Sequence, residues 1–259
     1  MPKFSANLSM LFTEVPFVER FAAAASSGFK AVEYVSPYEY PAEQIAAHLH
    51  AHSLVQALFN LPAGDWAAGE RGIACLPDRV GEFQDGVERA IAYAKVLGNP
   101  IVNCLAGIKP SHLESATALA ALVGNLKFAE RELRAAGLQL VVEPINHFDM
   151  PGYFLNTSVD ALAAIDAAGG GALLQYDVYH MQRMEGELAL SLERLMPRIG
   201  HIQIAGNPGR TEPDRGEINY AFIFPLIDRL GYQGWVGAEY RPVAGTADGL
   251  GWLAKWNQT

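Results

Sequence analysis

Eight short apolar segments alternate with eight longer stretches of helical character along the 259-residue chain. Alternation of this kind favours a parallel sheet, because parallel neighbours need a crossover connection and a helix usually supplies it. The expected strands are 4–10, 31–35, 54–59, 101–104, 138–142, 173–176, 199–204 and 236–238. The expected helices are 14–27, 41–52, 79–97, 114–136, 158–168, 187–196, 219–230 and 246–257.

Five of the expected helices end at a glycine, namely Gly28, Gly98, Gly137, Gly169 and Gly231. Glycine adopts the left-handed conformation of a helix C-cap at little cost, so these positions support the helix ends. Eight strand–helix units in 259 residues average about 32 residues each, a normal size for a (β/α)8 barrel. The sequence therefore predicts the α/β class, with a single (β/α)8 TIM barrel as one domain over residues 1–259.

The rival architecture is an open, doubly wound parallel sheet. Such a sheet usually carries a glycine-rich nucleotide-binding turn after its first strand. The corresponding segment here reads NLSMLFTEVP and contains no glycine. The closed barrel is therefore favoured.

The charge balance restricts the partners of the chain. Asp and Glu number 28 against 19 Lys and Arg, which gives a formal net charge of −9. Nucleic-acid-binding proteins usually carry a basic surface, so no nucleic-acid partner is expected. Hydrophobic residues make up 50% of the chain and charged residues 18%, so the chain can bury a large core and is not expected to be disordered.

The sequence also bears on location and assembly. No run of 18 apolar residues and no basic segment followed by an apolar one is present, so neither a membrane span nor a signal peptide is expected. Two cysteines, Cys75 and Cys104, suit a reducing compartment, and we expect a cytoplasmic protein. Trp252 and Trp256 near the C-terminus are compatible with a homo-oligomer, but the oligomeric state stays open.

Polar side chains close five of the expected strands: Glu33, Glu143, Asp177, Gln203 and Glu239. A barrel carries its active site at the C-terminal ends of its strands, and the last four residues come from consecutive strands. Adjacent carboxylates repel one another, and burial adds to the cost, whereas a divalent cation relieves both effects. An all-oxygen set suits Mg²⁺ or Mn²⁺. We therefore expect Glu143, Asp177, Gln203 and Glu239 to bind one of these cations, while Glu33 either joins them or bonds to a neighbouring loop.

Several residues near this rim are candidates for substrate binding. His180 follows Asp177 by three residues and could reach a substrate oxygen just outside the metal ligands. Arg210 and Arg215 lie in the long loop AGNPGRTEPDRGEINY, and an arginine there could hold a carboxylate with two hydrogen bonds. His201 points to the same strand face as Gln203, either as an interior residue or as a support for the site.

A second long loop, NLPAGDWAAGERG, follows the third strand. Asn60 opens this loop and could face the substrate. Trp66 lies further along and either excludes water when the loop closes over the site or packs on the surface as an ordinary aromatic loop residue. We expect this loop to act as a lid.

Three segments carry a resemblance to a known family. The opening FSANLSMLFTEVPFVERFAAAASSGF, the pair HIQIAG and RGEINY, and the segment GYQGWVGAEYRP together resemble hydroxypyruvate isomerases. That family belongs to the xylose isomerase-like TIM barrels, which also include ketose 3-epimerases and an apurinic endonuclease branch. The similarity extends over essentially the whole chain.

The resemblance implies roles for individual residues. It implies a metal site of Glu143, Asp177, Gln203 and Glu239, with the two glutamates as the acid/base pair. His180 and Arg210 fall where relatives contact substrate. The epimerase branch usually has a histidine at the position of Gln203, so this residue favours the isomerase branch.

The implied reaction converts hydroxypyruvate reversibly to tartronate semialdehyde through an enediolate. A C–H bond beside a ketone is too weakly acidic to ionise unaided at neutral pH, so a Lewis acid and a paired acid and base are needed. The alternatives are a 2-oxo-tetronate isomerase and a ketose 3-epimerase, and the motifs distinguish these two activities poorly from hydroxypyruvate isomerase. A nuclease is disfavoured by the net charge, and a non-catalytic sugar-acid sensor by the paired glutamates.

Overall fold

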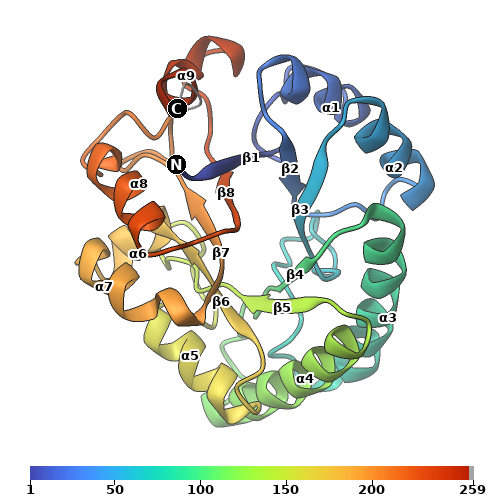
Figure 1. Cartoon of the computed structure of the whole chain (residues 1–259). Helices are drawn as coiled ribbons and strands as arrows, with labels where there is room; N and C mark the ends of the chain where they lie inside the picture. The colour runs from blue at the N-terminus through green and yellow to red at the C-terminus, as the bar shows by residue number, and fades with distance from the viewer. Residues whose placement is uncertain (257–259) are drawn as a thin grey trace.

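The computed structural model describes residues 1–256, and its eight strands close into a barrel in chain order (Figure 1). Every strand pairs in parallel with both of its neighbours. The strands are β1 (Lys3–Asn7), β2 (Ala31–Tyr34), β3 (Val55–Asn60), β4 (Ile101–Cys104), β5 (Gln139–Val142), β6 (Leu173–Asp177), β7 (Ile199–Ile204) and β8 (Trp235–Ala238). The predicted (β/α)8 barrel is confirmed.

The helices surround this ring of strands (Figure 1). They are α1 (Phe17–Ser26), α2 (Ala42–Ala51), α3 (Val80–Leu97), α4 (Ser115–Ala135), α5 (Ser158–Ala167), α6 (Val178–Met184), α7 (Leu188–Leu195), α8 (Tyr220–Arg229) and α9 (Gly251–Trp256). Three single 3-10 turns are η1 (Pro77–Arg79), η2 (Met196–Arg198) and η3 (Ala247–Gly249). Within residues 1–256, no helix is long and apolar enough to cross a membrane.

The glycines that were expected to end five helices all have positive φ angles. Their φ values lie between 66° at Gly98 and 117° at Gly169. At Gly98 the φ and ψ angles are those of a left-handed C-cap, and its backbone N–H donates to the carbonyl of Ala94. These residues therefore stop the helices for the conformational reason that the sequence suggested.

The barrel closes where the two ends of the chain meet. β1 pairs with β8 from Lys3↔Trp235 to Ala6↔Ala238, so the first and last strands, blue and red in Figure 1, lie side by side. Trp252 of α9 packs edge-to-face on Phe4, with their ring centroids 5.2 Å apart, and is 1% exposed. Trp252 therefore belongs to the core and is not available as a surface tryptophan for an oligomer contact.

The first strand and the first helix are shorter than expected. β1 ends at Asn7, and residues 8–16 form turns before α1 begins at Phe17. Pro16 has a φ of −54° and a ψ of 149° at the N-cap, and a proline also disfavours helical backbone in the residue before it. The predicted helix start at residue 14 was wrong for this reason.

The structure contains one helix that the sequence analysis missed. α6 follows β6 directly, so the residues around His180, which no expected helix covered, are helical. Asp177 starts this helix, because its side chain accepts hydrogen bonds from the backbone N–H groups of Tyr179 and His180. The expected helix 246–257 is instead η3 followed by α9, and its last position lies outside the described residues.

Candidate active site

Three buried carboxylates, those of Glu143, Asp177 and Glu239, meet at the C-terminal mouth of the barrel. Single ligand atoms from these residues and from His180 all lie within 4.8 Å of one another. Asp177 Oδ1 caps α6, whereas Asp177 Oδ2 accepts no hydrogen bond from any described residue. A buried acceptor without a donor, beside two further carboxylates, fits a divalent cation. This cluster can therefore hold a metal ion.

Burial and mutual repulsion change the acidity of these carboxyl groups. Burial raises the pKa of Glu143 well above its ordinary value, and the neighbouring charges of Glu239 and Asp177 add to the rise. Burial also raises the pKa of Glu239 to about 7, against the opposing effect of Arg210. The pKa of Asp177 is likewise raised by burial, less so because of Arg210 and two backbone N–H groups. A carboxyl group with a pKa of about 7, such as that of Glu239, can exchange protons near neutral pH.

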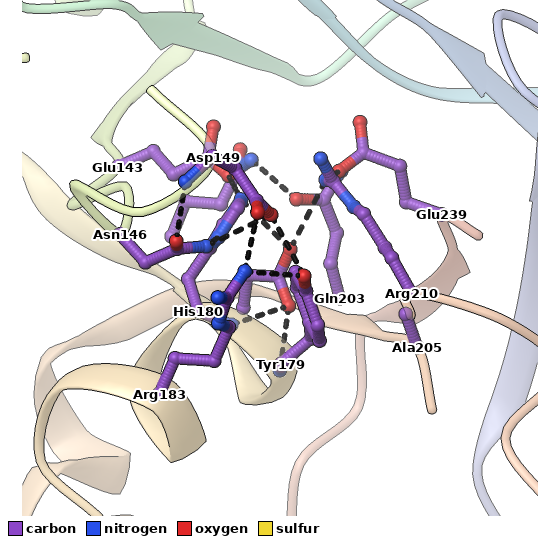
Figure 2. A network of polar contacts seen from close by, with 12 residues as sticks. Glu143, Asn146, Asp149, Tyr179, His180, Arg183, Gln203, Ala205, Arg210 and Glu239 are labelled. Carbon is purple, nitrogen blue, oxygen red and sulfur yellow. Dashed lines mark hydrogen bonds and ion pairs between the residues drawn. The ribbon is translucent and has the colours of Figure 1, made fainter. Parts of the chain in front are cut away.

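Arg210 reaches this cluster from the loop after β7. Its Nη2 donates a hydrogen bond to Glu239 and lies 3.6 Å from Asp177 Oδ2. Its backbone has a φ of 54°, in the left-handed region that is uncommon for residues with a side chain. The carbonyl of Arg210 accepts a 2.7 Å hydrogen bond from the backbone of Arg241, which helps to hold this conformation. Figure 2 shows Arg210 lying alongside Glu239.

Gln203 of β7 pairs in register with Asp177 of β6, and both ends of its amide have partners. Its Nε2 donates to Glu33 Oε1 at 2.8 Å, and its Oε1 accepts a 2.7 Å hydrogen bond from Gln175. This orientation turns the amide oxygen away from Glu33. An amide oxygen has a second lone pair, so Gln203 keeps the capacity to bind a cation.

Glu33 lies deeper in the barrel than the cluster and is completely buried. Besides Gln203, it accepts hydrogen bonds from Ser5 at 2.7 Å, His201 Nε2 at 2.9 Å and Asn7 at 3.2 Å. Burial alone would raise the pKa of Glu33, but the His201 ring and these donors hold it below its usual value. Glu33 is thus an ionised interior group outside the candidate cation cluster, and His201 is the interior residue that pairs with it.

His180 is held in one tautomer by Asn146. The backbone N–H of Asp149 donates to Asn146 Oδ1 at 2.9 Å, which fixes the amide so that its Nδ2 faces His180 Nδ1 at 2.6 Å. Since Nδ1 accepts, the proton lies on Nε2, which is 3.5 Å from Asp177 Oδ2 without forming a hydrogen bond to it. Burial lowers the pKa of His180 well below its ordinary value, so the ring is neutral. Figure 2 shows Asn146 and Asp149 gathered around His180.

Asn60 ends β3 and lines the same cavity. Its Oδ1 accepts a 3.2 Å hydrogen bond from Asn103 Nδ2, which also donates to Glu143 Oε2 at 3.1 Å. Asn60 is therefore connected to Glu143 through one amide group. The cavity has a volume of about 710 Å³, and Glu143, His180, Arg210, Glu239 and Asn60 line it.

Comparison with known proteins identifies the type of barrel. Residues 21–256 match the family model described as xylose isomerase-like TIM barrel. The chain belongs to this family. Within it, 254 residues are 51% identical to 2-oxo-tetronate isomerase of Cupriavidus necator and 51% identical to hydroxypyruvate isomerase of Escherichia coli. Each alignment covers 98% of this chain and 98% of the relative.

A solved structure agrees with this grouping. The crystal structure of AP endonuclease, family 2, from Brucella melitensis superposes with a TM-score of 0.96 at 42% identity over 99% of both chains. The two 51% relatives are named as isomerases, and the protein is an isomerase of the xylose isomerase-like family, close to the hydroxypyruvate and 2-oxo-tetronate isomerases.

The sequence analysis missed three asparagines of this xylose isomerase-like site: Asn7, Asn103 and Asn146. Asn7 Nδ2 donates to Glu239 Oε1 at 3.0 Å as well as to Glu33, so it links the candidate cation cluster to the interior network. The rule applied to the other strands could have found Asn7 and Asn103, because each stands at or near a strand end. No sequence pattern places Asn146 against His180, since 34 residues separate them.

Proposed function

We propose that this isomerase interconverts hydroxypyruvate and tartronate semialdehyde with the help of a divalent cation. One observation carries the proposal: Glu143 and Glu239 are buried beside each other, with raised pKa values, at the wall of a cavity of about 710 Å³ that a small substrate can enter. A relative 51% identical over 98% of both chains is named hydroxypyruvate isomerase, which supports the same substrate here.

Glu143 and Glu239 form the acid/base pair in this proposal. One carboxylate removes a proton from the hydroxymethyl carbon next to the ketone, which gives an enediolate. The other carboxyl group delivers a proton to the adjacent carbon, and the hydroxyl proton moves from the oxygen of the first carbon to the former ketone oxygen, so a ketone becomes an aldehyde with no net change in atoms. The two residues exchange roles when the reaction runs backwards, by microscopic reversibility.

Mg²⁺ or Mn²⁺ would be held by oxygens of Glu143, Asp177, Gln203 and Glu239. A bound cation would supply Lewis-acid stabilisation of the negative charge that develops on the substrate oxygens. The unpaired Asp177 Oδ2 and the free lone pair of the Gln203 amide oxygen support this donor set. His180 is left outside it, because its Nε2 carries a proton and cannot act as a ligand.

Three residues contact the substrate in the proposal. His180 donates from Nε2 to a substrate oxygen, and its neutral state suits this role because a cationic ring would compete with the metal. Arg210 approaches the same oxygens from the Glu239 side and offsets part of the cluster's negative charge. Asn60 borders the same cavity and supplies an amide.

A 2-oxo-tetronate isomerase is the second candidate, because the Cupriavidus necator relative is as similar as the Escherichia coli one. Its substrate differs by one hydroxymethylene group and needs the same chemistry. A ketose 3-epimerase would move a proton on one carbon of a neutral sugar. Gln203, where that branch usually has histidine, favours the acid isomerases.

A substrate panel tests these assignments. The purified protein is freed of metal, supplied with Mg²⁺ or Mn²⁺, and incubated with hydroxypyruvate, 2-oxo-tetronate, free ketoses or abasic DNA. Cation-dependent conversion of hydroxypyruvate with the highest kcat/KM supports the proposal. A higher kcat/KM for 2-oxo-tetronate or a ketose would move the assignment to that substrate. Cleavage of the DNA would indicate a nuclease. Activity in the metal-free protein would show that the reaction does not need a cation.

A further inference from the structure

Four arginines line the active-site cavity: Arg71, Arg183, Arg210 and Arg241. Arg183 pairs with Asp149, and Arg210 donates to Glu239, as Figure 2 shows. Over residues 1–256, neither Arg71 nor Arg241 forms an ion pair with a carboxylate. Two cationic groups at the cavity are therefore not neutralised by these residues.

Arg71 and Arg241 would leave the cavity with a net positive charge once a divalent cation is bound. The carboxylates of Glu143, Asp177 and Glu239 would carry −3 when ionised, and a divalent cation with Arg210 would supply +3. Asp149 and Arg183 cancel each other. A cation-loaded site would therefore hold a positive excess from Arg71 and Arg241, which fits an anionic substrate better than a neutral sugar.

Arg71 is the better oriented of the two. Its guanidinium stacks on Trp66, with Cζ 3.9 Å from the ring centroid. Both of its hydrogen bonds leave from Nη1, to the carbonyls of Trp66 at 3.0 Å and Glu70 at 2.6 Å. Nε and Nη2 donate to no other described residue, so one whole edge of the guanidinium remains for a bidentate partner.

The loop that carries Arg71 is fixed on both sides of it. On one side, Glu70 pairs with Arg79 next to the start of α3. On the other side, Gly72 has a φ of 104° and lies so close to the Leu105 carbonyl that a β-carbon there would overlap it. The backbone N–H of Gly72 also donates to the Ala63 carbonyl at 2.9 Å. Arg71 is thus presented from an anchored segment, which reduces the entropy lost when it binds.

We propose that Arg71, stacked on Trp66, receives the substrate carboxylate and makes the site selective for 2-oxo acids over free ketoses. The inference rests on the proposed function, since it names the group that anchors that substrate. Arg210 stays turned toward Glu239 and the reacting end of the substrate. Arg71 then fixes the opposite end, and the two arginines define the direction in which the substrate lies.

The test compares Arg71→Met and Arg71→Lys with the natural protein, all loaded with Mn²⁺. Methionine keeps an unbranched apolar side chain against Trp66 and removes the charge, whereas lysine keeps the charge without the planar edge. Arg89→Met is the matched control. Arg89 also stacks on an aromatic ring, that of Tyr38 at 4.8 Å, and donates to a backbone carbonyl, but it does not line the cavity.

Turnover is measured with hydroxypyruvate and with dihydroxyacetone, which replaces the carboxylate by a neutral hydroxymethyl group. Binding of glycerate, which has the carboxylate but no carbonyl to isomerise, is measured by calorimetry. For Arg71→Met we expect roughly a 10- to 100-fold loss in kcat/KM for hydroxypyruvate, mainly through KM, and a similar loss in glycerate affinity. Dihydroxyacetone turnover and the melting temperature stay unchanged, Arg71→Lys falls in between, and Arg89→Met behaves as the natural protein.

Equal glycerate affinity in Arg71→Met and the natural protein overturns the assignment. An equal loss in kcat/KM with dihydroxyacetone also overturns it, since that loss would not depend on the substrate carboxylate. An equal loss in kcat/KM for hydroxypyruvate in Arg89→Met overturns it as well, because the effect would then follow the overall charge of the protein and not the position of Arg71. The glycerate titration decides the role of Arg71 independently of turnover. If the natural protein binds glycerate through Arg71 but converts no 2-oxo acid, the proposed function fails and the carboxylate site stands.

Discussion

Gly237 of β8 leaves the space that the carboxylate of Glu33 from β2 occupies: a β-carbon on Gly237 would overlap both carboxylate oxygens. The two residues belong to strands that lie on either side of β1. Glu33 holds Gln203, which is one of the proposed cation ligands, and Asn7, which donates to another of them, Glu239. The absence of a side chain at one position therefore allows the interior network that supports the site.

Gly237→Ala tests this relationship. We expect it to lower the free energy of unfolding by about 1–3 kcal/mol, because an added methyl group in a filled interior forces its neighbours to shift. The measurement is urea unfolding. Gly124→Ala in α4 is the control, because nothing lies within 4 Å of its added carbon and alanine favours a helix, so it should stabilise the protein. Equal stability of Gly237→Ala and the natural protein would contradict the packing argument.

Asp177→Asn separates the two functions of Asp177. The remaining amide oxygen can still accept from Tyr179 and His180 and cap α6, but the charge beside Glu143 and Glu239 is lost. We expect the affinity for Mn²⁺, measured by calorimetry, to fall by at least about tenfold, while the melting temperature of the metal-free protein stays close to that of the natural chain. Unchanged Mn²⁺ affinity would remove Asp177 from the ligand set.

Glu143→Gln and Glu239→Gln test the acid/base pair. Each variant keeps its size but cannot exchange a proton, so kcat for hydroxypyruvate should fall by about 10²- to 10⁴-fold. Glu88→Gln, an exposed position on α3, is the control and should retain full turnover. Full activity in either active-site variant would rule out that glutamate as a proton carrier.

The raised pKa of Glu239 predicts a pH dependence of stability in the metal-free protein. Its folded pKa is about 7 and its ordinary value is 4.5, so the folded state binds the proton more tightly. The stabilisation is fully present below pH 4.5 and is lost as the pH rises through about 7. Relative to Glu239→Gln, which cannot titrate there, the natural protein should therefore lose melting temperature between pH 5 and pH 8.

The stabilisation that a bound cation gives should increase as the pH rises, because cations compete with protons for the same oxygens. The rise in melting temperature on adding Mg²⁺ or Mn²⁺ should thus be larger at pH 8 than at pH 5. Thermal unfolding with and without chelator at several pH values measures both effects. A cation effect that does not change with pH would contradict the raised carboxyl pKa values.

Some parts of the site were readable in the sequence because they follow from a local rule. In a closed parallel barrel, residues at the C-terminal ends of consecutive strands share one rim, so Glu143, Asp177 and Glu239 could be grouped without coordinates. The same rule could not tell which strand ends reach the rim. Glu33 ends an apolar run as Glu143 and Glu239 do, yet it is completely buried and does not line the cavity that those two residues line.

The sequence by itself determined the eightfold strand–helix alternation, the glycine caps and the set of acidic strand ends, because each depends on residues close together in the chain. Tertiary structure alone decided which polar atoms meet. It placed Asn146 against His180 and thereby set the tautomer, turned Arg210 toward Glu239, and left one edge of Arg71 free. These relationships depend on distances across the barrel, where burial and neighbouring charges set the pKa values and the hydrogen-bond directions, and no sequence spacing encodes them.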